Sequence, residues 1–166
     1  MVVASHSPYN RKPKVLMTTL DEIVDSFELI GDWDQRYQYL TELGEKLPVM
    51  PASLKIDKNK VKGCMSQVWV SAYTNEQDAA LIQYHGDCDT SIIKGVLAVL
   101  IQLVSGKEPE AIEKLDVDEI FTRLQLDENL SPNRHVGVYA IIELMKQQAR
   151  ELQSAQHNDD IAKQKC

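Results

Sequence analysis

The stretch NKVKGCMSQVWVSAYTNEQDAALIQYH, residues 59–85, decides the fold class. Its second half is rich in β-branched and aromatic residues, which is typical of β-strands. We expect two strands, in SQVWVSAYT and AALIQYH, joined by a turn at TNEQD, and a short third strand in NKVKG. This segment therefore predicts a small three-stranded antiparallel sheet, with Cys64 near a turn between two strands.

Apolar residues at helical spacing lie on both sides of this region. Two amphipathic helices precede it, and their N-terminal capping residues are expected to be Thr19 and Asp32. A helix that is apolar on nearly all sides follows it, starting after Asp89, and such a helix is expected to be buried. Ser131 and Pro132 fit the start of a last long helix. The expected fold class is α+β, with a three-stranded antiparallel sheet packed by five to six helices.

The composition is that of an ordinary globular protein of 166 residues, with 43% hydrophobic residues and a net charge of −7. This acidic balance argues against binding to nucleic acid or to an anionic membrane surface. The longest apolar run, residues 95–104, is too short to span a membrane. We expect one domain over residues 18–153, a mobile segment over 1–17 and a polar tail over 154–166. The N-terminus makes a poor secretory signal, so a cytoplasmic location is expected.

The three cysteines, Cys64, Cys88 and Cys166, are widely spaced and form no CxxC pair. They indicate neither a disulfide framework nor a zinc-ribbon site, and we expect no bound metal. Cys64 follows Gly63, which allows a sharp turn next to the sulfur. Two interpretations of Cys64 stay open on these grounds: a small buried hydrophobic residue, or a thiol held ready to react.

A reactive Cys64 would act as a thiolate, and Lys60 and Lys62 would favour that form if all three residues shared one side of a strand. The apolar residues around the turn are expected to tuck the sulfur partly away from water. These residues are Val61, Met65 and Val68.

Three segments of the chain resemble the SufE family of cysteine desulfuration proteins. NKVKGCMSQVWV, residues 59–70, is similar to the family's Gly-Cys signature. GDCDTSIIKGVLAVL, residues 86–100, is similar to its Asp-Ser-Asp segment, and LDENLSPNRHVGVYAI, residues 126–141, to its Ser-Pro-x-Arg-x-x-Gly segment. The resemblance covers roughly residues 19–150, and the three motifs occur in the same order and at the right separations.

The resemblance implies a SufE/IscU-like fold and a persulfide sulfur carrier in iron–sulfur cluster assembly. In this family, a cysteine takes sulfur from a pyridoxal-phosphate-dependent cysteine desulfurase of the SufS type and stimulates that enzyme. It then passes the sulfur to a scaffold of the SufBCD type. On this basis Cys64 is the sulfur acceptor, and the chain is a carrier and activator that needs no cofactor of its own rather than a stand-alone enzyme. The sequence leaves open whether the chain forms a homodimer.

The same resemblance suggests a partner-binding surface made of Gly63, Asp87, Asp89 and Arg134. Cys88 stands where the family usually has serine, which implies either a substitution without a role or a resolving thiol that could trap Cys64. The alternative function is an iron–sulfur or zinc-binding scaffold of IscU-like fold, for which Cys64, Cys88 and His85 would be the ligands. The metal content and colour of the purified protein would distinguish the two functions.

Overall fold

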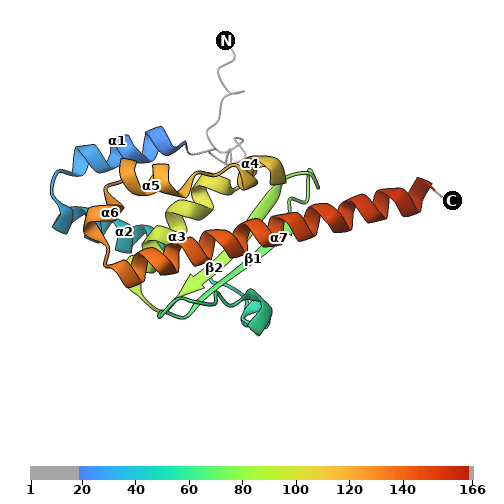
Figure 1. Cartoon of the computed structure of the whole chain (residues 1–166), viewed down its shortest axis with the longest axis horizontal. Coiled ribbons are helices and arrows are strands. Elements are labelled where there is room, and N and C mark those ends of the chain that lie inside the picture. The colour runs from blue at the N-terminus through green and yellow to red at the C-terminus, as the bar shows by residue number, and fades with distance from the viewer. Residues whose placement is uncertain (1–18, 165–166) are drawn as a thin grey trace, which may run out of the picture.

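A computed structural model of the chain describes residues 19–164. The expected mobile segment 1–17 and Cys166 lie outside the described residues. The described part contains seven α-helices, two short 3-10 helices and one two-stranded sheet (Figure 1). In chain order these are α1 (Leu20–Ile30), α2 (Trp33–Glu45), η3 (Ala52–Leu54), η4 (Asp57–Asn59), β1 (Val68–Thr74), β2 (Ile82–Cys88), α3 (Ser91–Val104), α4 (Pro109–Glu113), α5 (Val117–Arg123), α6 (Leu126–Asn129) and α7 (Pro132–Gln164).

Side-chain caps begin several of these helices. The Thr19 hydroxyl accepts a hydrogen bond from the Glu22 N–H at 3.2 Å, and the Asp32 carboxylate accepts one from the Gln35 N–H at 2.9 Å. Both caps confirm the sequence prediction, because each satisfies a backbone donor that the first helical turn leaves free. Helix α3 differs from the prediction, since its N-terminal capping residue is Thr90 rather than Asp89.

The sheet has two strands, so the prediction of three is wrong. β1 pairs with β2 in antiparallel register from Val68↔Cys88 to Thr74↔Ile82. The expected third strand shrinks to a single bridge between Lys60 and Trp69, because η4 ends at Asn59 and the chain turns again at residues 62 and 63.

A side chain takes the place of the missing strand. The Gln148 amide of α7 donates a hydrogen bond to the Val70 carbonyl at 2.8 Å and accepts one from the Ala72 N–H at 3.0 Å. These two backbone groups lie along the edge of β1 that β2 does not use. The amide thus pairs with the strand edge as a peptide group would, which protects the edge from water and from other strands.

One face of the sheet is buried under two helices. Helix α3 packs over β2 and helix α7 runs along β1 (Figure 1). Ten residues of α3 are buried, which confirms the expectation of a central helix. The buried Tyr84 hydroxyl of β2 donates to the Met145 carbonyl of α7 at 2.7 Å, so α7 lies on the face of the sheet that carries the Tyr84 side chain.

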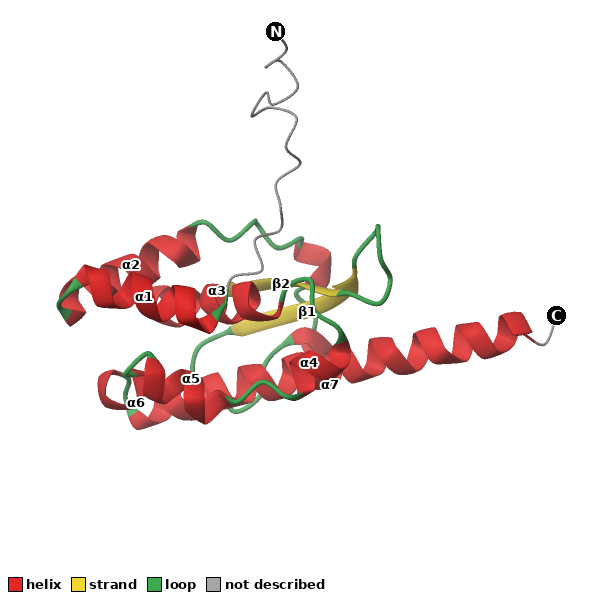
Figure 2. Ribbon diagram, turned by 90° about the horizontal axis from the view of Figure 1, so that it is seen from above, coloured by secondary structure: helices red, strands yellow, loops and turns green. Residues whose placement is uncertain are grey.

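Helix α7 is much longer than the core that it covers. It spans 33 residues, and its C-terminal end extends beyond every other described element (Figure 2). Residues 154–164, the described part of the expected polar tail, are helical and continue α7 without a break. In the described part of the chain, no helix is both long enough and apolar enough to cross a membrane.

Candidate functional site

Cys64 lies in a tight turn between Lys60 and the start of β1 at Val68. The Val61 N–H donates to the Val68 carbonyl at 2.8 Å, which closes the base of the turn. Gly63 adopts a φ of +85°, a conformation that residues with a side chain rarely adopt. The glycine therefore allows the chain to reverse immediately before the cysteine.

The far side of this turn is fastened to the segment that leads into α3. The Gln67 N–H donates to the Asp89 carboxylate at 3.0 Å, and the Asp89 N–H donates back to the Gln67 carbonyl at 3.1 Å. The Ser66 and Thr90 hydroxyls are 2.7 Å apart and share a hydrogen bond. These bonds place the cysteine turn beside the N-terminus of α3.

Cys64 is half-buried, and its sulfur lies against α7. Gly137 of that helix lies directly against it, since a Cβ atom added at Gly137 would come within 2.7 Å of the sulfur. Beside Cys64 is a cavity of about 240 Å³ that reaches the surface. It is lined by Cys64, Met65, Ser66, Thr90, Ile93, Ser131, Asn133 and Arg134.

The first turn of α7 gives this cavity a positive character. Ser131 precedes the helix, and its hydroxyl accepts a long hydrogen bond of 3.4 Å from the Arg134 N–H. A helix N-terminus carries a partial positive charge, and the Arg134 guanidinium adds a full one. Among the residues that the structure describes, no carboxylate forms an ion pair with Arg134.

The two lysines before Cys64 do not act as the sequence suggested. The Lys62 ammonium forms an exposed ion pair with Asp57 at 2.6 Å. Lys60 lies in the single bridge to Trp69 rather than in a regular strand that also contains Cys64. The cationic residue that lines a cavity together with Cys64 is instead Arg134.

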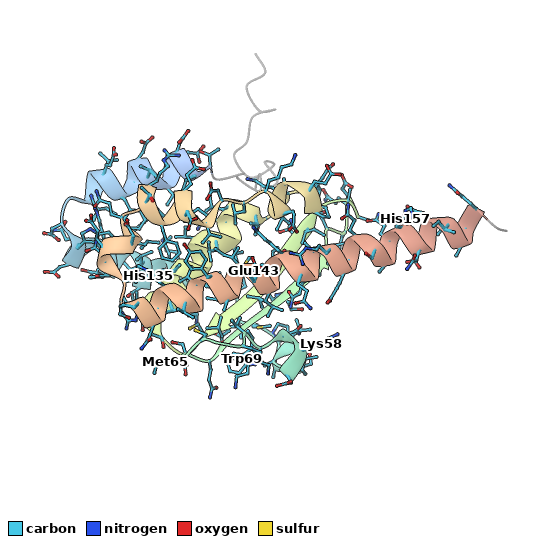
Figure 3. The ribbon with its side chains drawn as sticks, viewed as in Figure 1. Lys58, Met65, Trp69, His135, Glu143 and His157 are labelled. Carbon is cyan, nitrogen blue, oxygen red and sulfur yellow. The ribbon has the colours of Figure 1, made fainter. Side chains whose placement is uncertain are left out.

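The apolar residues around the turn divide into two groups. Val61 and Val68 are buried in the core, with exposed fractions of 3% and 0%. Met65 is 83% exposed, and Figure 3 shows its side chain at the surface beside the N-terminal end of α7. The expectation that Met65 folds over the sulfur is therefore wrong, and the shelter comes from α7.

The two predicted aspartates have different surroundings, and neither lines the cavity. Asp87 forms ion pairs with Lys55 at 2.5 Å and with Lys94 at 3.2 Å. Burial works to raise the pKa of Asp87, but hydrogen bonds from Lys55, from the Cys88 N–H and from Lys94 outweigh it and lower the pKa overall. Asp89 is exposed and holds the cysteine turn through the Gln67 backbone.

Cys88 lies on the buried face of β2, with an exposed fraction of 7%. Burial raises the pKa of its thiol to about 11, and the negative charges of Asp89, Cys64 and Asp87 add to that effect. His85 is three residues away on the same strand, so it lies on the opposite face, where its ring stacks on Tyr73 with centroids 4.5 Å apart. The alternative metal set of Cys64, Cys88 and His85 is therefore divided between two faces of the sheet. Within residues 19–164, no three His, Cys, Asp or Glu side chains gather in a way that could hold a metal ion.

The structure brings Cys64 and Arg134 to one cavity and leaves Gly63 at the exposed turn. Sequence reasoning assigned no role to Ser66, Thr90 or Gly137. Ser66 and Thr90 bond to each other across 24 positions of the chain, a separation that no local pattern reveals. Gly137 had one signal, the glycine that ends the Ser-Pro-x-Arg-x-x-Gly segment.

Fold and site together define a small α+β protein that presents one half-buried thiol at a turn, beside a cavity with a positively charged wall. The family model described as SufE, Fe-S metabolism associated domain, matches residues 21–149. The chain belongs to the SufE family, which acts in sulfur transfer for iron–sulfur metabolism.

Individual relatives agree with this family. An uncharacterized SufE-like protein of Rhizobium meliloti is 37% identical over 134 residues, which cover 80% of this chain and 96% of that protein. A second one, from Rhizobium etli, is 36% identical over 138 residues, which cover 82% of this chain and 93% of that protein. The solution structure of a hypothetical protein from Thermus thermophilus matches with a TM-score of 0.67 over 81% of this chain and 96% of that one. Its sequence identity is 20%, so it supports the fold alone.

Proposed function

We propose that this chain accepts sulfur as a persulfide on Cys64 from a pyridoxal-phosphate-dependent cysteine desulfurase and stimulates that enzyme. It then passes the sulfur to an iron–sulfur cluster scaffold in the cytoplasm. The observation that carries the proposal is that the half-buried Cys64 and the cationic residue Arg134 line the same cavity. Pyridoxal phosphate belongs to the desulfurase in this scheme.

The transfer is an exchange at a sulfur–sulfur bond. The Cys64 thiolate attacks the outer sulfur of the desulfurase persulfide, and a new S–S bond forms as the old one breaks. The desulfurase cysteine leaves as a thiolate, and Cys64 ends as a persulfide. Electrons and atoms balance without an added oxidant or reductant, so the acceptor has to supply only a thiol that the donor can reach.

The cavity beside Cys64 has room for the transferred atom. Its volume of about 240 Å³ is well above the roughly 30 Å³ that one water molecule occupies in the liquid. Three hydroxyl-bearing side chains and one amide line it, and their donors suit an anionic sulfur. A persulfide that turned into this space would be partly shielded from oxidants and from other thiols.

The charge of the cavity wall favours the same product. A persulfide anion here would lie near the N-terminus of α7 and near Arg134, both of which attract negative charge. Because Arg134 is exposed and lacks a carboxylate partner among the described residues, the same guanidinium is available to an acidic surface on the desulfurase.

The surface that meets the desulfurase would surround the cysteine turn. Gly63, Met65 and Arg134 are all exposed there, and the exposed Asp89 fastens the turn. Asp87 would support this surface indirectly, because its ion pairs with Lys55 and Lys94 stabilise the C-terminal end of β2. Exposed apolar and arginine side chains are typical anchors in protein interfaces.

The direct test is the intact mass of the protein after incubation with a cognate desulfurase and free cysteine. We expect a gain of one sulfur atom on Cys64, and Cys64→Ser should lose both this adduct and the stimulation of the desulfurase. Cys88→Ser is the matched control and should keep both. If Cys64→Ser stimulates the enzyme fully while Cys88→Ser does not, the assignment of the acceptor is wrong.

A second test addresses the docking surface. Arg134→Ala should weaken the affinity for the desulfurase about fivefold or more, and the effect should shrink as salt is added. Arg150→Ala is the control, since Arg150 lies on the same helix but pairs with Glu113, outside the cavity lining. Equal affinities for the two variants would remove Arg134 from the surface.

A further inference from the structure

Gly137 is the residue of α7 that lies against the reactive sulfur. A Cβ atom built on it would be 2.7 Å from the Cys64 sulfur, and the two next-nearest atoms, at 3.6 and 3.9 Å, are the Cβ and Cα of the same cysteine. Cβ atoms in proteins essentially never approach a heavy atom within 3.0 Å. The present position of the sulfur therefore requires a residue without a side chain at 137.

Nothing in the backbone of α7 calls for glycine at this position. Gly137 is the sixth residue of a 33-residue helix and is absent from the residues with positive φ, which are Gly31, Gly63, Gly106 and Gln125. Glycine is the poorest helix former after proline, so its place in the body of a helix is unfavourable in itself. The contact with Cys64 is the feature of the structure that accounts for it.

We propose that Gly137 is a positioning residue that makes the socket for the Cys64 sulfur. It thereby sets the balance between a thiol sheltered against α7 and a thiol turned toward solvent. The consequence for sulfur acceptance rests on the proposed function, whereas the position of the thiol does not.

A methyl group added at residue 137 would displace the Cys64 sulfur toward the surface. The Cys64 side chain has three staggered positions about its Cα–Cβ bond, and the methyl group would exclude the one that it now occupies. The cavity beside the sulfur opens to the surface, and the neighbouring Met65 is already 83% exposed. The thiol is expected to rotate outward while the helix stays intact, because alanine favours the helix more than glycine does.

The test compares the alkylation of Cys64 by iodoacetamide in the full-length protein and in Gly137→Ala. The rate is followed by mass spectrometry of the peptide that contains Cys64, and circular dichroism monitors folding. We expect Cys64 to react at least about fivefold faster in the folded variant. This factor corresponds to the lower end of the free-energy cost of overpacking a buried site, here applied to the sheltered position of the thiol. Val136→Ala, a change at the adjacent exposed position, should leave the rate unchanged. A folded Gly137→Ala protein with the wild-type rate would overturn the proposal.

A pair of variants decides the matter even if Gly137→Ala folds poorly. Cys64→Ala removes the sulfur and leaves its Cβ 3.6 Å from the position of the added methyl, an ordinary contact distance. Gly137→Ala should therefore raise the melting temperature in the Cys64→Ala background, through its helix propensity alone. In the wild-type background the rise should be smaller or reversed. The same loss of stability in both backgrounds would mean that the methyl group clashes with something other than the sulfur, and the socket role would be refuted.

The functional consequence is measured separately with the desulfurase and cysteine. Once loaded with sulfur, Gly137→Ala should be alkylated by iodoacetamide at its outer sulfur at least about fivefold faster than the wild-type protein, because that sulfur is less shielded. A wild-type protein that accepts no sulfur would refute the proposed function while leaving the alkylation result to judge Gly137. Equal rates of persulfide alkylation in the two loaded proteins would refute the shielding role.

Discussion

The Gln148 side chain replaces a strand, and its removal should cost the fold more than any neighbouring polar residue of α7. Its exposed fraction is 8%, and its amide satisfies the Val70 carbonyl and the Ala72 N–H at the edge of β1. It also donates to the Asn59 side-chain carbonyl at 3.3 Å. Asn59 in turn donates to the Leu54 carbonyl at 2.8 Å, so one amide connects α7, β1 and the segment before the cysteine turn.

The perturbation is Gln148→Met, which keeps the length of the side chain and removes all three hydrogen bonds. The Val70 carbonyl is fully buried and would be left without this partner, which costs about 1–3 kcal/mol. The Ala72 N–H is half-buried and can recover part of its bond from water, so its loss adds about 1 kcal/mol. The expected fall in the free energy of unfolding is therefore about 3 kcal/mol, which lowers the melting temperature by about 6–12 °C in a domain of this size.

The assay is urea denaturation followed by circular dichroism, with thermal melting as a second measure. Gln147→Met is the matched control, because Gln147 is exposed and bonds only to Glu151 on the same helix among the described side chains. The control should change the free energy of unfolding by less than about 0.5 kcal/mol. If Gln148→Met is as stable as Gln147→Met, the amide does not support the edge of β1 and the account of the missing strand is wrong.

Two further predictions concern the titrating groups near the site. Asp87→Asn should lower stability by about 1 kcal/mol near neutral pH, a modest value because Lys55 and Lys94 are about one-third exposed. The pKa of Asp87 is lowered in the folded protein, so the stability difference between wild type and Asp87→Asn should persist above the ordinary pKa of 3.8 and vanish as the pH falls below it. A difference in melting temperature that stays constant from pH 7 to pH 3 would contradict this. Burial raises the pKa of Cys88 to about 11, so roughly one thiol in a thousand should be ionised at pH 8. Cys88 should therefore stay unlabelled by iodoacetamide while Cys64 reacts. Comparable labelling rates at the two cysteines of the folded protein would show that Cys88 is not held in the core.

The elements that the sequence predicts well are those fixed by neighbouring residues. The Thr19 and Asp32 caps depend on a donor three positions away, and both appear in the structure. The apolar circumference of residues 91–104 indicated a buried helix for the same reason, because it is a property of one segment alone.

The third strand failed because strand pairing is not local. NKVKG has a composition suitable for a strand, but only Lys60 pairs, and the Gln148 amide occupies the positions beside Val70 and Ala72. Gln148 lies 76 positions after Ala72 in the chain. A lone glutamine in a helix pattern gives no sign that its side chain will complete a sheet.

The cavity beside Cys64 explains why three separate motifs carry the family resemblance. Its lining residues come from the cysteine turn, from the start of α3 and from the first turn of α7, and every one of them falls within residues 59–70, 86–100 or 126–141. The residues that build this cavity therefore come from all three of the segments that carry the resemblance. The sequence could therefore indicate which segments matter, but the contact between Gly137 and the Cys64 sulfur arises only when α7 lies against the turn. A glycine within a helix, three residues after an exposed arginine and joined in one motif to a distant reactive cysteine, is in this fold best explained by the space that the sulfur needs.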